Sequence, residues 1–221
     1  MNLTAELVPT WLSLAAWPLF AGVVIWNFWG APWALLHRNE LNRLFSLAVI
    51  LLAGLWWMKV GVHDGLEFHL LGITTLVLIF GWRLSLVAGA TALFLTTLLA
   101  GGDWDTLGLN GLLTVVLPVA LASWLHRMIY QRLPRHFFVY VLVTAHFASM
   151  LVIAVVILSG ALLLGLLGAH PWERVWGDYL VFMPLVLLPE GFVNGAVMTT
   201  LIILRPEWVR SFDDRDYIEG K

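Results

Sequence analysis

The length of its apolar runs limits this chain more than any other feature. Segments such as 84–101 and 138–168 are almost wholly apolar, with no Asp, Glu, Lys or Arg inside them. A helix needs about 20 mostly apolar residues to cross the roughly 30 Å hydrocarbon layer of a bilayer. Hydrophobic residues make up 61% of the chain and charged residues only 12%, which is outside the range of water-soluble domains. The sequence therefore predicts an all-α, polytopic membrane protein.

We predict about seven transmembrane helices in a single integral membrane domain that covers residues 1–221. The predicted spans are 10–29, 44–60, 67–82, 84–101, 109–128, 138–168 and 178–204. The third is short for a full crossing, so we expect it to be tilted or partly re-entrant. Glycines 160, 165 and 168 are expected to break the end of the sixth span. Pro184 and Pro189 predict a kink or an unwound turn near the middle of the seventh.

The distribution of basic residues predicts the orientation. If the N-terminus is outside, only Lys59 and Arg174 fall in outer loops. The inner loops and tail then hold Arg38, Arg43, Arg83, Arg127, Arg132, Arg135, Arg205, Arg210, Arg215 and Lys221. Because basic residues accumulate on the cytoplasmic side, we predict an N-out/C-in protein of the cell inner (plasma) membrane, surrounded by lipid. Residues 205–221 would form a solvated cytoplasmic tail.

Four potential metal ligands lie together on the predicted outer side, just before or at the start of the third span: His63, Asp64, Glu67 and His69. Imidazole suits zinc, copper, nickel and cobalt, and carboxylate widens the choice. On a helix His63 and Glu67 would share one face, whereas His69 would point elsewhere. The four converge only if the backbone before Phe68 is irregular. The other interpretation is a set of ordinary polar side chains in an outer loop.

Glu190, Asn194 and His146 are further polar residues that lie well inside the predicted spans. A charged group at bilayer depth is costly, so Glu190 is a candidate functional residue, with Asn194 on the same helical face. The alternative is a glutamate that ties helices together by hydrogen bonds. His146 is interpreted mainly as a packed histidine. A membrane metalloenzyme that uses Glu190 and His146 is the least favoured hypothesis, and we expect no enzymatic activity and no nucleic-acid partner.

Three motifs resemble the CbiM/NikM family, the substrate-binding membrane components of energy-coupling-factor (ECF) cobalt and nickel importers. In "FHLLGITTLVLIFG", residues 68–81, the family's His, Gly and Phe-Gly positions are matched by His69, Gly72, Phe80 and Gly81. "TLGLN", residues 106–110, resembles Thr-Leu-Gly-x-Asn. "MPLVLLPEG", residues 183–191, resembles Ile-Pro-Leu-x-x-x-Glu-Gly with one extra residue.

This resemblance implies a bundle of seven helices with an N-terminal segment that tucks back into it. It also implies that metal is held by the N-terminal amine, here that of Met1, by a histidine at position two and by His69. Position two is Asn2 in this chain, and the family's Pro-Thr after the histidine is replaced by Leu70 and Leu71. His63, Asp64 or Glu67 could supply the ligand that Asn2 lacks.

We therefore expect a substrate-binding component for uptake of a divalent transition-metal ion, cobalt, nickel or zinc. The resemblance implies that an ECF transmembrane component and ATPase subunits drive transport, and the chain itself has no nucleotide-binding loop. Metal binding needs neutral imidazole, so capture is expected to weaken below about pH 6. The alternative hypothesis is a non-transporting accessory or sensor subunit whose histidines are structural.

Overall fold

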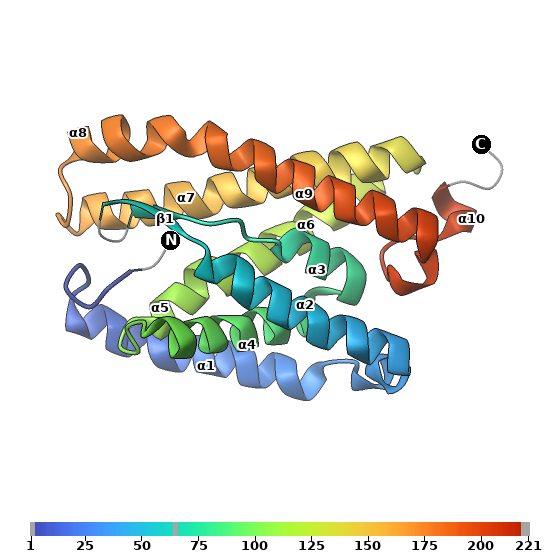
Figure 1. The fold of residues 1–221 in the computed structure, drawn as a ribbon, viewed down its shortest axis with the longest axis horizontal. Helices are drawn as coiled ribbons and strands as arrows, with labels where there is room; N and C mark the ends of the chain where they lie inside the picture. Colours follow the sequence, from blue (N-terminus) through green and yellow to red (C-terminus); the bar gives the residue numbers. More distant parts are fainter. Residues whose placement is uncertain (1–2, 64–65, 218–221) are drawn as a thin grey trace.

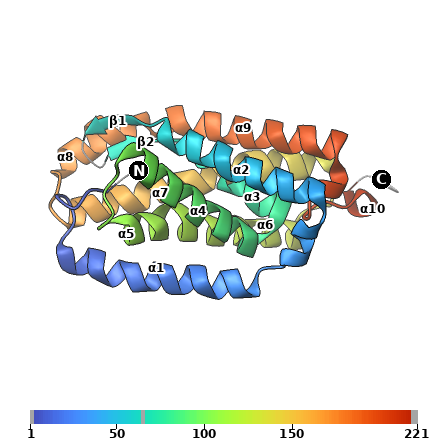
Figure 2. The same cartoon turned by 60° about the horizontal axis from the view of Figure 1, so that its bottom comes forward.

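The computed structural model describes residues 3–63 and 66–217 of the chain as one elongated helical bundle (Figures 1 and 2). Among these residues, six helices are long and apolar enough to cross a membrane. They cover Thr10–Gly30, Asn39–Trp57, Trp82–Ala100, Leu107–Arg132, Val139–Leu166 and Trp172–Leu204. The all-α membrane fold predicted from the sequence is therefore confirmed, with six of the seven predicted spans formed by long helices.

The long helices are joined and extended by shorter elements, some of them 3₁₀ or π turns (η). In chain order the elements are α1 Thr10–Gly30, η1 Trp33–His37, α2 Asn39–Trp57, β1 Val60–His63, β2 Leu66–Phe68, α3 Ile73–Phe80, α4 Trp82–Ala100, α5 Leu107–Gly111, η2 Leu112–Val116, α6 Leu117–Arg132, η3 Val139–Phe147, α7 Ala148–Leu166, α8 Trp172–Arg174, η4 Val175–Tyr179, η5 Leu180–Phe182, α9 Met183–Leu204, η6 Pro206–Trp208 and α10 Asp214–Tyr217.

In the third predicted span, 67–82, the structure forms only a short helix, so the prediction is wrong only as far as a continuous helix is concerned. Its helix α3 has only eight residues, which span roughly 12 Å. The strand β2 and an irregular segment precede it. Together they lead from the end of the bundle that carries β1 and β2, which form a hairpin, toward the other end (Figure 1). Gly72 and Gly81 flank α3 with positive φ angles of 65° and 80°. Glycine tolerates this backbone region far better than other residues, so both ends of the short helix are specified locally.

The C-terminal tail closes the other end of α3. The amides of Arg210 and Ser211 donate hydrogen bonds to the carbonyls of Ile79 and Leu78, each 3.1 Å long. A helix otherwise leaves its last carbonyls without partners. The tail side chains of Val209, Phe212 and Tyr217 are also buried. The expectation of a wholly solvated tail is therefore wrong as far as Tyr217.

Two further expectations about helix breaks need correction. Helix α9 begins at Met183 and continues through Pro189, so of the two expected alternatives, a kink or an unwound turn, the unwound turn is absent from the middle of this helix. The irregular backbone lies before it, in η4 and η5. Helix α7 likewise continues through Gly160 and Gly165 and ends at Leu166. Of the three glycines expected to break it, Gly168 alone lies beyond its end, with a φ angle of 71°.

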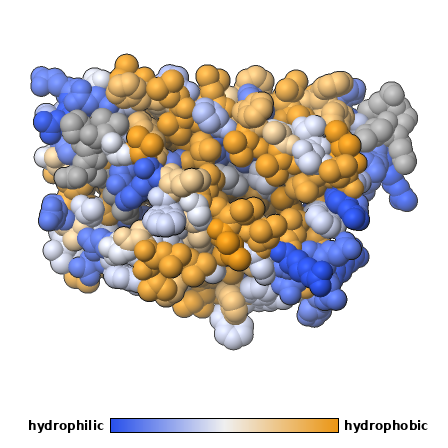
Figure 3. Space-filling view, in the orientation of Figure 1, coloured by the Kyte–Doolittle hydropathy of each residue, from blue (hydrophilic) through white to orange (hydrophobic). Residues whose placement is uncertain are grey.

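The surface has an apolar middle and hydrophilic ends, as a membrane protein requires (Figure 3). Apolar side chains cover the middle of the face drawn in Figure 3, and hydrophilic residues gather toward its two ends. Large side chains such as Trp26, Trp29 and Leu99 are exposed, which is expected of surface that faces lipid. The arginines other than Arg174 lie toward the end that carries α10, whereas the hairpin, α8 and the start of α1 lie at the opposite end.

Candidate functional site

The ligand-rich stretch after α2 forms a β-hairpin. Strands β1 and β2 pair antiparallel, with Gly61 opposite Glu67, and an irregularity in register lies between Gly61 and His63. His63 and Glu67 therefore lie on separate strands and do not stack on one helix face. The backbone of His63 is described but its side chain is not, and Asp64 and Met1 lie outside the described residues. Glu67 and His69 are the predicted ligands in this stretch whose side chains can be placed.

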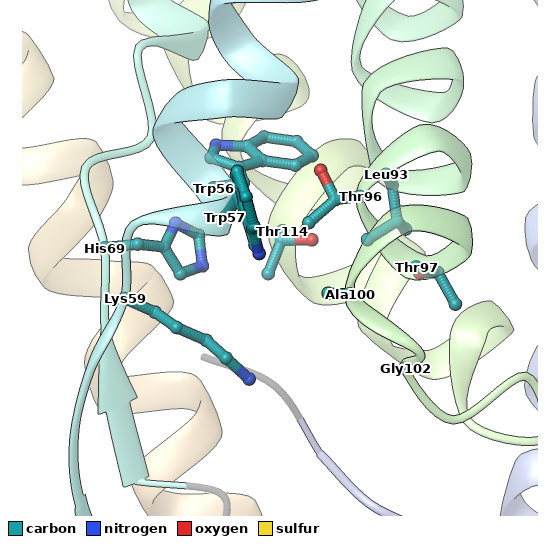
Figure 4. Close-up of a pocket in the computed structure, with 10 residues that line it drawn as sticks. All are labelled: Trp56, Trp57, Lys59, His69, Leu93, Thr96, Thr97, Ala100, Gly102 and Thr114. Carbon is teal, nitrogen blue, oxygen red and sulfur yellow. The ribbon is translucent and has the colours of Figure 1, made fainter.

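His69 follows β2 and its imidazole borders a small cavity of about 50 Å³, which we call the His69 cavity (Figure 4). Its ring lies 5.8 Å from the ring of Trp56, and its Nδ1 lies 3.2 Å from the carbonyl oxygen of Leu70. The rest of the wall comes from α2, α4, η2 and the loops that follow α2 and α4. Its residues are Trp56, Trp57, Lys59, Leu93, Thr96, Thr97, Ala100, Gly102 and Thr114. The predicted ligand His69 thus faces a cavity between helices.

The segment after His69 is held on both sides by buried polar groups. The indole Nε1 of Trp56 donates to the carbonyl of Leu71 at 3.1 Å. The amides of Leu71 and Gly72 donate to Oε2 and Oε1 of Glu190, at 2.7 and 2.9 Å. The side chain of Glu190 is 1% exposed. The backbone two and three residues beyond His69 is therefore fixed from opposite sides.

Asn194 extends the same arrangement by one helical turn. Its Nδ2 donates to Oε1 and to the carbonyl of Glu190, and its Oδ1 accepts from the amide and the hydroxyl of Thr75. Glu190 and Asn194 of α9 thus supply acceptors at and just before the first turn of α3; we call this set of contacts the α3 anchor. Inside a membrane, amides at a helix start have no water to bind, so a neighbouring helix must provide for them.

His146 belongs to neither arrangement. It packs against α9 where two glycines leave room, because a Cβ added to Gly191 or Gly195 would lie 3.1 or 3.3 Å from an atom of His146. Its ring lies 5.0 Å from the ring of Phe147. His146 is not among the residues that line the His69 cavity. The geometry is that of a histidine packed between two helices.

The N-terminal segment enters the bundle, as the resemblance implied. Leu3 is fully buried, its amide donates to Oδ1 of Asn110 at 2.9 Å, and its carbonyl accepts from Nδ2 of Asn110 and the hydroxyl of Thr106. The hydroxyl of Thr114 donates to the carbonyl of Asn110 and lines the His69 cavity. The residue that holds the N-terminal segment is therefore one turn away from the cavity wall.

Glycine permits the close approach that this arrangement needs. A Cβ on Gly108 would lie 2.6 Å from the Cα of Trp17 in α1. The "TLGLN" motif thus combines two polar side chains that bind Leu3 with a glycine that lets α1 approach α5. The motif was visible in the sequence, but its contacts with Leu3 were not, because they join residues more than 100 positions apart.

Lys59 is a residue of the site that the sequence reasoning missed. Its Nζ lies 2.9 Å from Oε1 of Glu67, and its side chain borders the His69 cavity. The available signal was that Lys59 is one of two basic residues on the predicted outer side. Over the residues that the structure describes, no three or more His, Asp or Glu side chains lie close enough to hold a metal ion.

Comparisons with known proteins agree with this fold. The family model CbiM, "Cobalt uptake substrate-specific transmembrane region", matches residues 2–208. A crystal structure of a truncated transition metal transporter superposes with a TM-score of 0.77 at 15% identity, over 92% of this chain and 99% of that chain. An identity this low supports the shared fold alone. None of the curated proteins matches the chain.

The family match extends across each of the three motifs that carried the resemblance and ends within the C-terminal tail, at residue 208. It therefore rests on nearly the whole chain, including the N-terminal segment, the half-helix α3 and the α3 anchor. This protein belongs to the CbiM family of cobalt uptake substrate-specific transmembrane regions.

Proposed function

We propose that this protein is the substrate-binding membrane component for uptake of a divalent transition-metal ion of the cobalt and nickel class. The observation that carries the proposal is the position of His69, whose imidazole borders a small cavity between helices in a chain of the cobalt uptake family. Imidazole is a good ligand for cobalt, nickel and zinc. The rigid support of the segment after His69 favours a binding site, because ligands must be held in place.

The further ligands in this proposal come from the hairpin and from the N-terminal segment, whose Leu3 is bound one helical turn from Thr114 of the cavity wall. The hairpin contributes Glu67 and brings His63 and Asp64 as candidates, and the N-terminal segment, held at Leu3, brings the amine of Met1. This donor set contains nitrogen ligands and carboxylates. It suits cobalt, nickel or zinc better than calcium or magnesium, which prefer oxygen ligands alone.

The arginine-rich end of the bundle would face the cytoplasm, and the hairpin end the exterior, in the inner (plasma) membrane. The ion would then arrive on the side where His69 lies. A separate ECF transmembrane component and ATPase subunits would supply the energy for its release to the cytoplasm. Glu190 would serve as the buried anchor that keeps the half-helix α3 and the His69 segment together.

A metal-binding panel tests this proposal. The protein is purified in detergent, loaded separately with cobalt, nickel, zinc and copper, passed through a desalting column and analysed for metal. We expect about one ion per chain for wild type with at least one metal, and almost none for His69→Ala. His136→Ala is the matched control, since His136 is an exposed imidazole beyond α6, at the arginine-rich end.

Equal metal content in wild type and His69→Ala would reject the proposed site. If wild type and His136→Ala bind one ion but cells that coexpress the ECF partners take up no radiolabelled cobalt, nickel or zinc, the chain binds metal without transporting it. This result would favour the accessory or sensor function. The observation that favours this second function is the position of Lys59, whose positive charge borders the cavity.

A further inference from the structure

The His69 cavity contains a positive charge of the protein's own. Lys59 follows α2 and extends toward the same space as the imidazole of His69, as Figure 4 shows. The described wall includes no Asp or Glu side chain, and the carboxylate that pairs with Lys59, that of Glu67, is not part of it. A cation that enters a space of about 50 Å³ therefore meets a like charge directly.

The partner of Lys59 is a carboxylate with unused capacity. Oε1 of Glu67 lies 2.9 Å from Nζ of Lys59, whereas Oε2 of Glu67 is buried and has no hydrogen-bond partner among the described residues. An ionised carboxylate has acceptor sites on both oxygens, and a buried oxygen without a partner is unfavourable. Only one oxygen of Glu67 is therefore paired, with Lys59, and the other, Oε2, is available as a ligand for a second cation.

We propose that Lys59 is an internal counter-cation that the captured metal ion displaces. With the cavity empty, the ammonium of Lys59 neutralises Glu67. When the metal ion binds at His69, the carboxylate of Glu67 turns to the metal and Lys59 leaves the cavity for solvent. This inference rests on the proposed function, because it assigns a role during capture to a residue next to the same cavity.

The geometry allows this exchange. The side chain of Lys59 is 33% exposed, so its four-carbon stem already has a path to water. The side chain of Glu67 is 18% exposed and lies across from Gly61, whose missing side chain leaves space beside the carboxylate. Displacing Lys59 opposes binding, so it sets the affinity below the maximum that the ligands allow. A site with lower affinity releases its ion more readily to the next step of transport.

Amine acylation tests the displacement directly. The chain has two lysines, Lys59 and Lys221, and the amine of Met1. The purified protein is treated briefly with a water-soluble acetylating ester, with and without saturating cobalt, and labelling is read by peptide mass spectrometry. We expect cobalt to raise the labelling rate of Lys59 several-fold relative to Lys221, which is the internal reference. An unchanged or lowered rate at Lys59 in samples that contain bound cobalt overturns the inference.

The same samples separate this inference from the proposed function. Bound cobalt is measured in parallel, so a protein that binds none overturns both. Protection of the Met1 amine by cobalt would support its role as a ligand, whatever happens at Lys59. A protein that binds cobalt through His69 while Lys59 remains equally or less reactive keeps the proposed function and loses the displacement.

Substitutions give a second, independent readout. Removing the like charge in Lys59→Gln is expected to tighten cobalt binding by about tenfold or more. Lys59→Arg keeps the charge and should bind within about threefold of wild type. Glu67→Gln should weaken binding, because an amide is a poorer ligand than a carboxylate. Binding by Lys59→Gln that is equal to or weaker than wild type contradicts the proposal.

Discussion

The α3 anchor holds Leu71, Gly72 and Thr75, only a few residues beyond His69, yet the polar groups of the anchor and those beside the His69 cavity are satisfied to very different degrees. In the anchor, both oxygens of Glu190 accept hydrogen bonds, and Asn194 uses both its amide nitrogen and its oxygen. Beside Lys59 of the cavity wall, one oxygen of Glu67 is paired with the ammonium of Lys59, while the other is buried without a partner among the described residues.

This difference is consistent with a structural role for the anchor and with the binding role that we propose beside His69. A fully bonded group deep in the membrane supports the fold, because removing it leaves its partners unsatisfied. A partly bonded group beside a cavity keeps capacity for a ligand. Glu190 was a candidate functional residue because of its predicted depth in the membrane, but its contacts indicate an anchor. We propose that the ligands come from His69 and the hairpin instead.

Glu190→Leu should give the largest loss of stability. The amides of Leu71 and Gly72 and the Nδ2 of Asn194 would lose an acceptor in an apolar environment. Each unsatisfied donor costs about 1–3 kcal/mol, so we expect a loss of about 3 kcal/mol or more, read as a lowered Tm in detergent. Glu190→Gln keeps one acceptor oxygen and should lose about half as much. A Tm of Glu190→Leu equal to that of wild type would show that the α3 anchor does not stabilise the fold.

Asn110→Ala should have the next largest effect, about 1–2 kcal/mol, because Asn110 bonds both the amide and the carbonyl of the buried Leu3. The N-terminal segment should detach locally, so amide exchange at residues 3–5 should become faster. Asn42→Ala replaces an exposed asparagine of α2 and is the control. Unchanged exchange at residues 3–5 in Asn110→Ala would show that other contacts hold this segment.

Gly72→Ala should destabilise by about 1–2 kcal/mol, because an L-residue at a φ of 65° is strained. The new Cβ would also lie 3.3 Å from Cδ1 of Leu52. Gly54→Ala is the contrasting control: it lies within α2, and its Cβ would meet nothing within 4 Å. There we expect a small gain in stability. Equal losses at both positions would mean that the turn before α3 does not require glycine.

His69→Ala and Lys59→Gln should change stability least, by less than about 1 kcal/mol without metal, since the Lys59 pair is partly exposed. Their effect should appear only in metal binding. The check is a thermal unfolding series with and without cobalt, where metal raises the Tm of wild type but not of His69→Ala. If His69→Ala or Lys59→Gln lost as much stability without metal as Glu190→Leu does, the two regions would not differ in their contribution to the fold.

The sequence predicts the long helices well because each apolar run reports directly on burial in lipid. The segment 67–82 was predicted wrongly for the same reason. Its residues are apolar because they are buried within the bundle. An irregular segment or a short helix in the interior of the bundle needs apolar side chains as much as a full transmembrane helix does. What distinguishes them is the pair of positive-φ glycines, Gly72 and Gly81, and bonds from α9 and the tail that no local pattern reveals.

The candidate site was predictable to a smaller extent. His69 and Glu67 were recognisable by residue type, and Glu190 and Asn194 by their depth and spacing. The partners of Glu190 are backbone amides 118 and 119 residues away, and backbone amides leave no mark in a sequence. Lys59 was hidden for another reason: a lysine at the end of a span is an ordinary feature, and only the cavity it borders makes it notable.

The central claim is that a divalent transition-metal ion binds beside His69. An anomalous difference map from crystals soaked with cobalt, collected at the cobalt absorption edge, locates the ion directly. We expect a peak within coordination distance of the imidazole of His69, with the ammonium of Lys59 turned away from the cavity. A map with no peak there, or with its strongest peak at a histidine of the arginine-rich end, would contradict it.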